Sequence, residues 1–457
     1  MNNIFKKIVE KKLRFFAKRI LKKYQPDVIG ITGSVGKTST KEAIYTVLSG
    51  KFPCRKNIKN YNNEIGVPLT IIGAESGRKS LFAWFRVFYK AVGLIISTKP
   101  YPKILILEMA ADKPGDLEYL TDFVPLKVAV VTAIAPVHLE SFGKIENIVR
   151  EKSQLVAVLP KEGFALLNAD DELVFGMREK TKALISTYGF SSEAEVKAYE
   201  PALSFSEGGL DGLERRTLKG LSFKVSYQGS TTPFFLSGVL GEYQVYCALA
   251  ATAVGIAYGL NLVNISESLK NFKSPAGRMN LIQGIKGTLI IDDSYNSSPK
   301  AALAALEVLE KINLDEQIPE KVKPEALKKL TQEGRRFLKF VVLGDMAELG
   351  EFTEEGHQIV GEKAAGVADV LITVGEKAKI IARQAIKKGM HEVQVFSFDY
   401  ALEAGKFLQD RIHKGDIILA KGSQVARMEK VVKEIMAEPM RAAELLCRQG
   451  REWEGKN

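Results

Sequence analysis

The fold of the first half of the chain is decided by the stretch Val28-Ile29-Gly30-Ile31-Thr32-Gly33-Ser34-Val35-Gly36-Lys37-Thr38-Ser39. An apolar run enters it, glycines interrupt it, and Lys-Thr closes it ahead of residues 40–48, whose pattern indicates a helix. This order predicts a phosphate-binding loop, because consecutive backbone N–H groups and a helix start bind phosphate oxygens. The strict motif has glycine where Ile31 stands, so the fit is to the variant G-x-x-G-x-x-G-K-T.

We expect this loop to hold the phosphates of a nucleotide. Lys37 would reach the terminal phosphates, and the hydroxyl of Thr38 would bind Mg²⁺. The alternative is a glycine-rich turn that carries a lysine by chance, and the agreement of strand, loop and helix disfavours it. The candidate nucleotide-binding residues here are Gly33, Ser34, Val35, Gly36, Lys37, Thr38 and Ser39.

The composition of the 457 residues is that of a globular protein with two or three domains. The three cysteines are far apart and form no C-x-x-C pair, and the four histidines are scattered. This usage argues against a cysteine-based zinc site or a disulfide framework, and it suits a cytoplasmic location.

Most of the net charge of +11 lies at the start of the chain, where residues 1–23 carry nine Lys or Arg and one Glu. The remainder is close to balanced, so we expect no nucleic-acid partner. Apolar residues recur at helical spacing among these cations and predict a basic amphipathic helix within residues 1–26. It would either attach to an anionic membrane surface or pack on the body with a solvated charged face.

A second apolar segment covers residues 81–96. Arg86 and Lys90 interrupt it, and it is too short to span a membrane comfortably. It is either a helix with a broad buried face or a second membrane-facing element. The chain would then be peripheral at the inner face of the membrane.

The rest of the chain alternates apolar strands with helices, which predicts parallel sheets covered on both faces. Residues 187–237 are β-rich, and the alternating pattern restarts near Pro275. We therefore expect an α/β fold, with a P-loop ATPase domain at 27–275 followed by a Rossmann-like, doubly wound domain at 276–457. Residues 313–336 are predicted to form an exposed helical insertion.

Three further residues are candidates for the chemistry of an ATP site. Glu108 ends an apolar strand, where open α/β sheets bind ligands, although an exposed acid at a strand end is the simpler interpretation. His138 follows another strand, and Lys152 lies on the next predicted helix. Taken alone, His138 is as compatible with a structural role, and Lys152 is by default an exposed lysine.

An ordered set of motifs resembles the Mur ligase family, the ATP-dependent amide-forming enzymes of peptidoglycan synthesis. The match covers roughly residues 27–440. Besides the phosphate loop, Glu108 and Lys152, it consists of Asn60-Tyr61-Asn62, His138-Leu139-Glu140, Asn168-Ala169-Asp170, Gly277-Arg278, Asp292-Asp293-Ser294-Tyr295-Asn296, Gly344-Asp345-Met346-Ala347-Glu348-Leu349-Gly350 and Lys421-Gly422-Ser423. The Asp292–Asn296 and Gly344–Gly350 stretches resemble the branch whose members add D-alanyl-D-alanine.

The resemblance implies ATP and two Mg²⁺ ions as cofactors. The implied metal ligands are Thr38, Glu108, His138 and Lys152, and Lys152 falls where the family carries a carbamylated lysine. A lowered pKa would favour this modification, because it requires a neutral amine. The implied catalytic residues are Lys37, His138, Lys152 and Arg278.

The resemblance also implies the binding residues and partners. Asp293 and Asn296 would hold the nucleotide, and Arg278 would contact the γ-phosphate. The implied substrate residues are Asn60, Asn62, Asp345, Glu348, Lys421 and Ser423. The partners would be a muramyl peptide or related acid and D-alanyl-D-alanine, and the chain would act as a monomer.

The chain departs from the family pattern in three places. About 26 residues precede the ATPase domain, so the resemblance implies that the usual UDP-sugar-binding domain is missing. Ala133 stands where an Asn usually does, and residues 241–248 replace a His-Asn pattern. Two alternatives therefore stay open: a ligase for another substrate, like folylpolyglutamate or cyanophycin synthetase, and a membrane-associated nucleotide-binding regulator.

Overall fold

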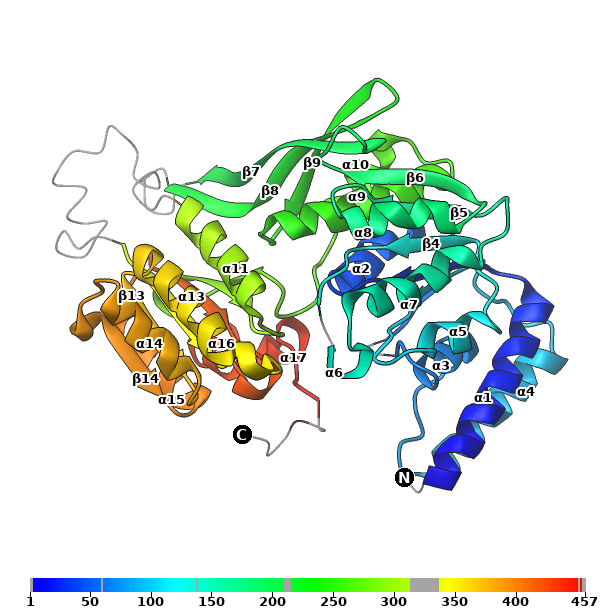
Figure 1. Cartoon of the computed structure of the whole chain (residues 1–457), viewed down its shortest axis with the longest axis horizontal. Helices are drawn as coiled ribbons and strands as arrows, with labels where there is room; N and C mark the ends of the chain where they lie inside the picture. The colour runs from blue at the N-terminus through cyan, green and yellow to red at the C-terminus, as the bar shows by residue number, and fades with distance from the viewer. Residues whose placement is uncertain are drawn as a thin grey trace. The chain divides into compact units, whose positions relative to one another are not determined.

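The computed structural model describes residues 3–58, 61–136, 139–208, 215–312, 337–450 and 453. The chain forms two compact units (Figure 1). Unit 1 comprises 1–201, 222–235 and 242–272, and unit 2 comprises 202–221, 236–241 and 273–457. Three strands, β7 (Val196–Gly208), β8 (Arg215–Tyr227) and β9 (Ser230–Ser237), contribute to both units.

Unit 1 is built on a sheet whose strand order is β2-β3-β1-β4-β5-β6-β7-β8-β9. Every strand pair from β2 to β7 is parallel, which confirms the predicted parallel sheet. Its other strands are β1 (Asp27–Thr32), β2 (Cys54–Lys56), β3 (Ile104–Glu108), β4 (Val128–Val131), β5 (Phe164–Asn168) and β6 (Leu184–Gly189).

Helices cover both faces of this sheet, because its central strands are apolar on both sides. Val28, Leu105 and Val131 share a core with α3 (Gly66–Ile72), α4 (Leu81–Ile96), α5 (Asp116–Thr121) and α7 (Ile145–Ala157). The helices α2 (Lys37–Ser49), α9 (Glu242–Ala257) and α10 (Leu262–Leu269) pack together elsewhere on the sheet. Two short helices are α6 (Leu139–Phe142) and α8 (Glu172–Phe175).

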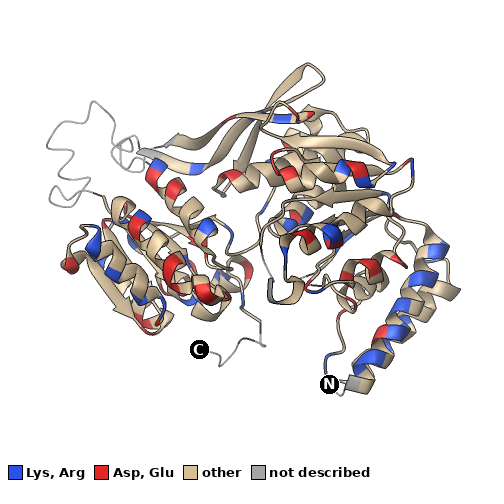
Figure 2. Ribbon diagram, viewed as in Figure 1, with Lys and Arg blue, Asp and Glu red and all other residues tan. Residues whose placement is uncertain are grey.

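The basic N-terminal segment forms α1 (Asn3–Tyr24), which packs against α3 and α4. Its apolar face is buried through Val9, Leu13, Ala17, Ile20 and Leu21. The Nζ of Lys23 donates to the carbonyls of Leu94 and Ile95, both at 2.9 Å, at the end of α4. The interpretation in which this helix packs on the body is therefore confirmed. Its cations lie along the rest of the helix (Figure 2).

Unit 2 contains a second sheet, in the order β10-β11-β15-β12-β13-β14. Only β10 runs antiparallel to its neighbour. The strands are β10 (Asn280–Gln283), β11 (Leu289–Asp293), β12 (Lys339–Gly344), β13 (Val370–Val374), β14 (Val395–Phe398) and β15 (Ile417–Lys421).

Two helices, α15 (Ala401–Arg411) and α16 (Glu429–Ile435), share a core with Ile290, Phe340 and Ile418 of this sheet. The helices α11 (Pro299–Lys311), α13 (Thr353–Val367) and α14 (Ala378–Lys387) pack on one another, and α17 (Ala442–Leu445) follows α16. The doubly wound arrangement is as predicted. The predicted insertion at 313–336 lies outside the described residues.

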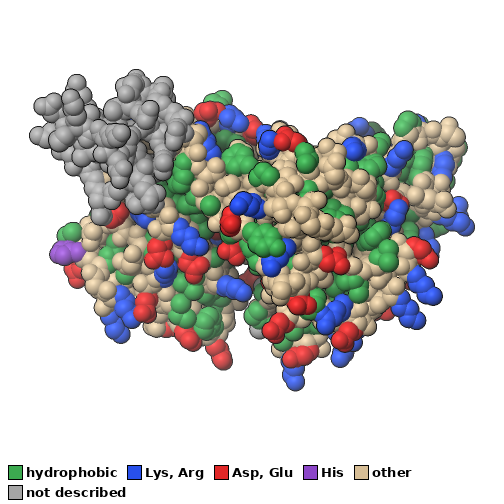
Figure 3. Space-filling view, turned by 90° about the horizontal axis from the view of Figure 1, so that it is seen from above, with side chains coloured by type: hydrophobic (Ala, Val, Ile, Leu, Met, Phe, Trp, Pro, Cys, Tyr) green, Lys and Arg blue, Asp and Glu red, His purple; other side chains and the backbone are tan. Residues whose placement is uncertain are grey.

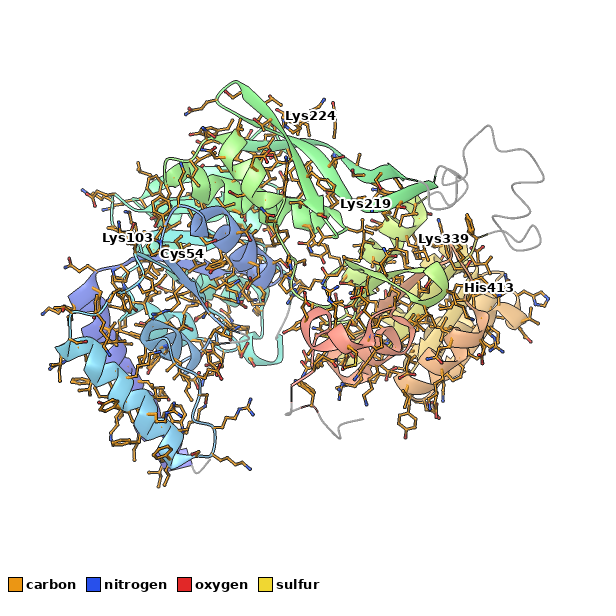
Figure 4. All side chains as sticks on the ribbon, turned by 180° about the vertical axis from the view of Figure 1, so that it is seen from behind. Cys54, Lys103, Lys219, Lys224, Lys339 and His413 are labelled. Carbon is orange, nitrogen blue, oxygen red and sulfur yellow. The ribbon has the colours of Figure 1, made fainter. Side chains whose placement is uncertain are left out.

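Two features of the composition, the mixed charges and the isolated cysteines, can be placed in the structure. Basic and acidic side chains are mixed over the face shown in Figure 3. Each cysteine is a free thiol, and Cys54 lies near Lys103 (Figure 4), whose backbone N donates to the carbonyl of Pro53 at 2.8 Å. Across the described ranges, no helix has both the length and the apolar character needed to cross a bilayer.

Candidate active site

The phosphate loop connects β1 to α2 and depends on two glycines. Gly33 has φ +147°, and a Cβ there would lie 2.0 Å from the Oγ1 of Thr132. Gly36, at the start of α2, is left-handed with φ +84°. The loop is fixed to the segment after β4, because the N of Ser34 donates to the carbonyl of Ala133 at 2.7 Å. The glycines are therefore required by close approach and by backbone angle.

Lys37 bends back over the loop that precedes it. Its Nζ donates to the carbonyl of Gly33 at 2.6 Å and to that of Ser34 at 3.3 Å. The ammonium group is thus held at the loop backbone, where the phosphates of a nucleotide would add their negative charge.

Glu108 is the centre of a polar cluster beside this loop, and it is only 3% exposed. Its Oε1 accepts hydrogen bonds from the Oγ1 of Thr38 at 3.2 Å and from the Nδ2 of Asn62 at 3.1 Å. Its Oε2 lies 3.4 Å from the Nζ of Lys41. The Oδ1 of Asn57 accepts from the backbone N of Glu108 at 2.5 Å. The carboxylate is therefore oriented from several sides.

This cluster fits a magnesium ion bound together with phosphates. Mg²⁺ is commonly held by one or two carboxylates, a hydroxyl, waters and phosphate oxygens rather than by a full set of protein ligands. Glu108 supplies a carboxylate oxygen and Thr38 a hydroxyl oxygen, and these two atoms are 3.2 Å apart. Within the described part of the chain there is no group of three or more His, Cys, Asp or Glu that could hold a metal ion.

Lys152 lies on α7 and is 3% exposed, which corrects the default interpretation of an exposed helix lysine. The pKa of its amine is lowered to about 7, mainly by burial and next by the charge of Lys37, while the charges of Glu151 and Asp112 oppose the shift. The carboxylate of Glu151 accepts hydrogen bonds from the backbone N of Gly115 at 2.8 Å and of Leu117 at 2.7 Å. Lys152 is thus a buried amine that can be neutral near pH 7.

Unit 2 brings together several residues that the sequence had singled out. The Nζ of Lys421 donates to the Oδ2 of Asp293 at 2.6 Å and to the carbonyl of Asn296 at 2.9 Å. The guanidinium of Arg278 lies 4.3 Å from the centre of the Tyr295 ring, and its charge acts on Asp293. These residues form one group at the end of β11.

A second group in unit 2 surrounds the ends of β12 and β15. The Oδ1 of Asp345 accepts from the backbone N of Ala378 at 2.7 Å, at the start of α14. The carbonyl of Asp345 accepts from the backbone N of Ser423 at 2.9 Å. Ser423 is buried, whereas Glu348 is exposed and has φ +62°. Asp345 and Ser423 are therefore brought together by this backbone hydrogen bond.

Two predicted site residues, Asn60 and His138, lie outside the described residues. Three residues of the cluster were not found from the sequence, namely Lys41, Asn57 and Asp112. Lys41 follows Lys37 by four residues on a helix, so helical spacing could have placed it on the same side. Asn57 carried no comparable signal, because its contact with Glu108 depends on how distant segments meet, and Asp112 acts on Lys152 through its charge.

The chain is similar to known proteins over most of its length. The model of the Mur ligase middle domain matches residues 31–83 and 94–255, and that of the Mur ligase, glutamate ligase domain matches residues 323–424. The UDP-N-acetylmuramoyl-tripeptide–D-alanyl-D-alanine ligase of Bacillus subtilis is 27% identical over 94% of this chain and 80% of the relative.

Two further matches extend over most of the chain. The ligase of the same name from Mycobacterium leprae is 30% identical over 87% of this chain and 71% of its own length. The crystal structure of the MurF ligase from Thermotoga maritima in complex with ADP is 26% identical, with a TM-score of 0.68, and the match covers 93% of this chain and 83% of that chain. Together with the ordered site residues, these matches show that the chain belongs to the Mur ligase family.

Proposed function

We propose that the chain is an ATP-dependent ligase that joins D-alanyl-D-alanine to the carboxyl group of a muramyl peptide. The observation that carries this proposal is the cluster of Lys37, Thr38 and Glu108 at a phosphate loop, with Lys152 buried within electrostatic reach of Lys37. The names of the relatives from Bacillus subtilis and Mycobacterium leprae supply the substrates.

The reaction would proceed in two transfers. A carboxylate oxygen of the acid attacks the γ-phosphorus of ATP, ADP leaves, and an acyl phosphate forms. The amine of the dipeptide then attacks the acyl carbon, inorganic phosphate leaves with the carboxylate oxygen, and the amine proton is released. Lys37 would stabilise the negative charge that gathers on the transferring phosphoryl group.

We also propose two Mg²⁺ ions, which would neutralise phosphate charge and orient the reacting oxygens. Thr38 and Glu108 would hold the first, and His138 and Lys152 would contribute to the second. Lys152 can serve only as an anion, so we propose that it is carbamylated: its neutral amine adds to CO₂ and loses a proton. Its burial supports this step, since burial favours the neutral amine.

The remaining assignments are proposals of the same kind. Asp293 and Asn296 would bind the nucleotide, and Arg278 would contact its γ-phosphate. The two proposed domains are residues 27–275 and 276–457. The proposed substrate residues are Asn60, Asn62, Asp345, Glu348, Lys421 and Ser423. Asn62 and Lys421 already contact Glu108 and Asp293 respectively, so they would act partly by positioning those acids. A monomer in the cytoplasm, at the inner face of the membrane, completes the proposal.

The test is phosphate release measured over pairs of acids and amines. We expect release to require a muramyl peptide and D-alanyl-D-alanine together, and to fall to background when either is omitted. Release with a folate or a cyanophycin-like acid in place of the muramyl peptide would instead support the ligase for another substrate. Release that ignores every amine would contradict ligation and favour the regulator.

A further inference from the structure

An apolar stripe runs along the outer side of α4. The residues at positions 82, 85, 89, 92 and 96 follow the spacing that places side chains on one face of a helix. The side chains of Leu81, Phe82, Phe85, Tyr89 and Ile96 are 67–78% exposed, and Val92 is partly exposed. The opposite side of the helix is buried through Trp84, Val87, Ala91 and Leu94. A row of large apolar side chains left in water usually marks an interaction surface.

The helix α4 lies beside α1, as Figures 1 and 4 both show. The rings of Phe16 and Phe88 are 5.8 Å apart, and the Nζ of Lys12 is 5.6 Å from the centre of the Phe88 ring. Ile8 and Phe15 of α1 are also exposed and continue the apolar area toward this helix. The apolar stripe of α4 and the outer side of α1 therefore form one surface, here called the α1–α4 surface.

The cations of α1 differ in their contacts, and Lys12, Arg19 and Lys23 lie against aromatic rings or backbone carbonyls. Lys6 is paired with Glu64 at 2.8 Å, and Arg14 with Asp122. The exposed Lys11, Lys18 and Lys22 form no ion pair with any residue that the structure describes. Their charge is consequently available to a partner, and Figure 2 shows basic residues along the length of α1.

This combination selects the class of partner. In a closed dimer the same surface of each copy would face the other. The basic helices of the two copies would then lie close together, and their positive charges would repel. An anionic bilayer surface supplies negative headgroups for the cations and an apolar layer for the aromatic and aliphatic side chains. Charge complementarity therefore favours the bilayer.

We infer that the α1–α4 surface docks on an anionic phospholipid bilayer, with the side chains of α4 entering the headgroup region and the cations of α1 binding the headgroups. This inference deepens the proposed membrane location and does not depend on the ligase chemistry. The apolar face of α1 is occupied by the protein core, so α1 contributes its outer, charged side to this surface.

The inference is tested by sedimenting the full chain with vesicles of phosphatidylcholine, with and without phosphatidylserine. Wild type is expected to bind the anionic vesicles about tenfold or more tightly than the neutral ones. The double variant Phe82→Ser, Phe85→Ser is expected to lose about tenfold of that affinity. Lys18→Gln with Lys22→Gln is expected to weaken binding to anionic vesicles only. Val393→Ser with Met440→Ser removes equally exposed apolar side chains elsewhere and serves as the matched control.

Equal binding by wild type and the Phe82, Phe85 double variant would overturn the inference. The inference would also be overturned if the wild-type chain sedimented as a dimer without vesicles and the double variant as a monomer. The α1–α4 surface would then bind a second copy of the chain. Phosphate release in solution, without vesicles, is measured for every variant. We expect it to be unchanged, so that a failure of membrane docking is separated from a failure of the ligase proposal, and an unfolded variant is recognised by its loss of activity.

Discussion

Thr38 and Glu108 are 70 residues apart in the chain, yet the hydroxyl of one donates to the carboxylate of the other at 3.2 Å. Strand pairing produces this contact, because β1 and β3 run parallel in adjacent positions and Ile31 is opposite Glu108. The phosphate loop leaves β1 one residue later, and Thr38 lies in the first turn of α2, which begins at Lys37. The sheet therefore sets the carboxylate of Glu108 beside the phosphate loop.

Replacing Glu108 with Gln tests this relationship. The amide keeps the shape of the side chain and loses the charge, so Mg²⁺ should bind more weakly. We expect the Mg²⁺ concentration for half-maximal phosphate release to rise about 10- to 100-fold, as it does when metal-binding groups are lost. Glu118→Gln, an exposed change on α5, is the control and should leave it unchanged. An unaltered Mg²⁺ requirement in Glu108→Gln would contradict the assignment.

The burial of Lys152 leads to a prediction about CO₂. With a pKa of about 7, the amine is increasingly neutral above that pH and protonated below it. Wild-type ligation should therefore fall in CO₂-free buffer, recover on addition of bicarbonate, and recover less well below pH 7. Lys152→Met should be weakly active and should not respond to bicarbonate. Recovery of Lys152→Met by bicarbonate would refute a carbamate at this residue.

Asp292 should make stability depend on pH. Burial raises the pKa of its carboxyl to about 7, although hydrogen bonds from Ser294 oppose the shift. Between about pH 4 and 7 the folded chain then holds a proton that the unfolded chain has released, so this group lowers stability as pH rises through that window. Asp292→Asn should raise the melting temperature at pH 8, with a smaller gain at pH 5. Asp410→Asn, on the exposed side of α15, should show no such trend.

Glu429 is fully buried and lies between two arginines. The Nε of Arg427 donates to one carboxylate oxygen at 2.6 Å, and the Nη1 of Arg448 donates to the other at 3.1 Å. Arg448→Met should destabilise the chain by about 3 kcal/mol, because a buried charge loses a partner. Arg441→Met breaks exposed pairs and should cost at most about 1 kcal/mol. Denaturant unfolding measures both, and equal losses would contradict the account.

Local patterns carried much of the fold and part of the site. The phosphate loop was predictable because strand, glycines and helix are contiguous in sequence, and the parallel sheets followed from alternating apolar segments. Glu108 was predictable from its place at a strand end. Lys41 and Asn57 were not found, because their contacts with Glu108 depend on how distant segments meet.

Tertiary packing decided what amphipathic patterns left open. The pattern of α1 suits burial or a membrane equally well, and only the structure shows that its apolar face is covered. Lys421 was expected to face a substrate, and the pairing of β11 with β15 sets it opposite Asp293, with which it forms a buried ion pair. A sequence motif alone does not show which residues of two paired strands lie opposite each other.

The central claim is that an acyl phosphate links ATP to the amide product. It is tested most directly with a muramyl peptide whose reacting carboxyl group carries ¹⁸O in both oxygen atoms. The peptide is incubated with ATP, Mg²⁺ and D-alanyl-D-alanine. The account predicts inorganic phosphate that contains one ¹⁸O atom, together with an amide product that retains the other. Unlabelled phosphate released alongside the amide would contradict it.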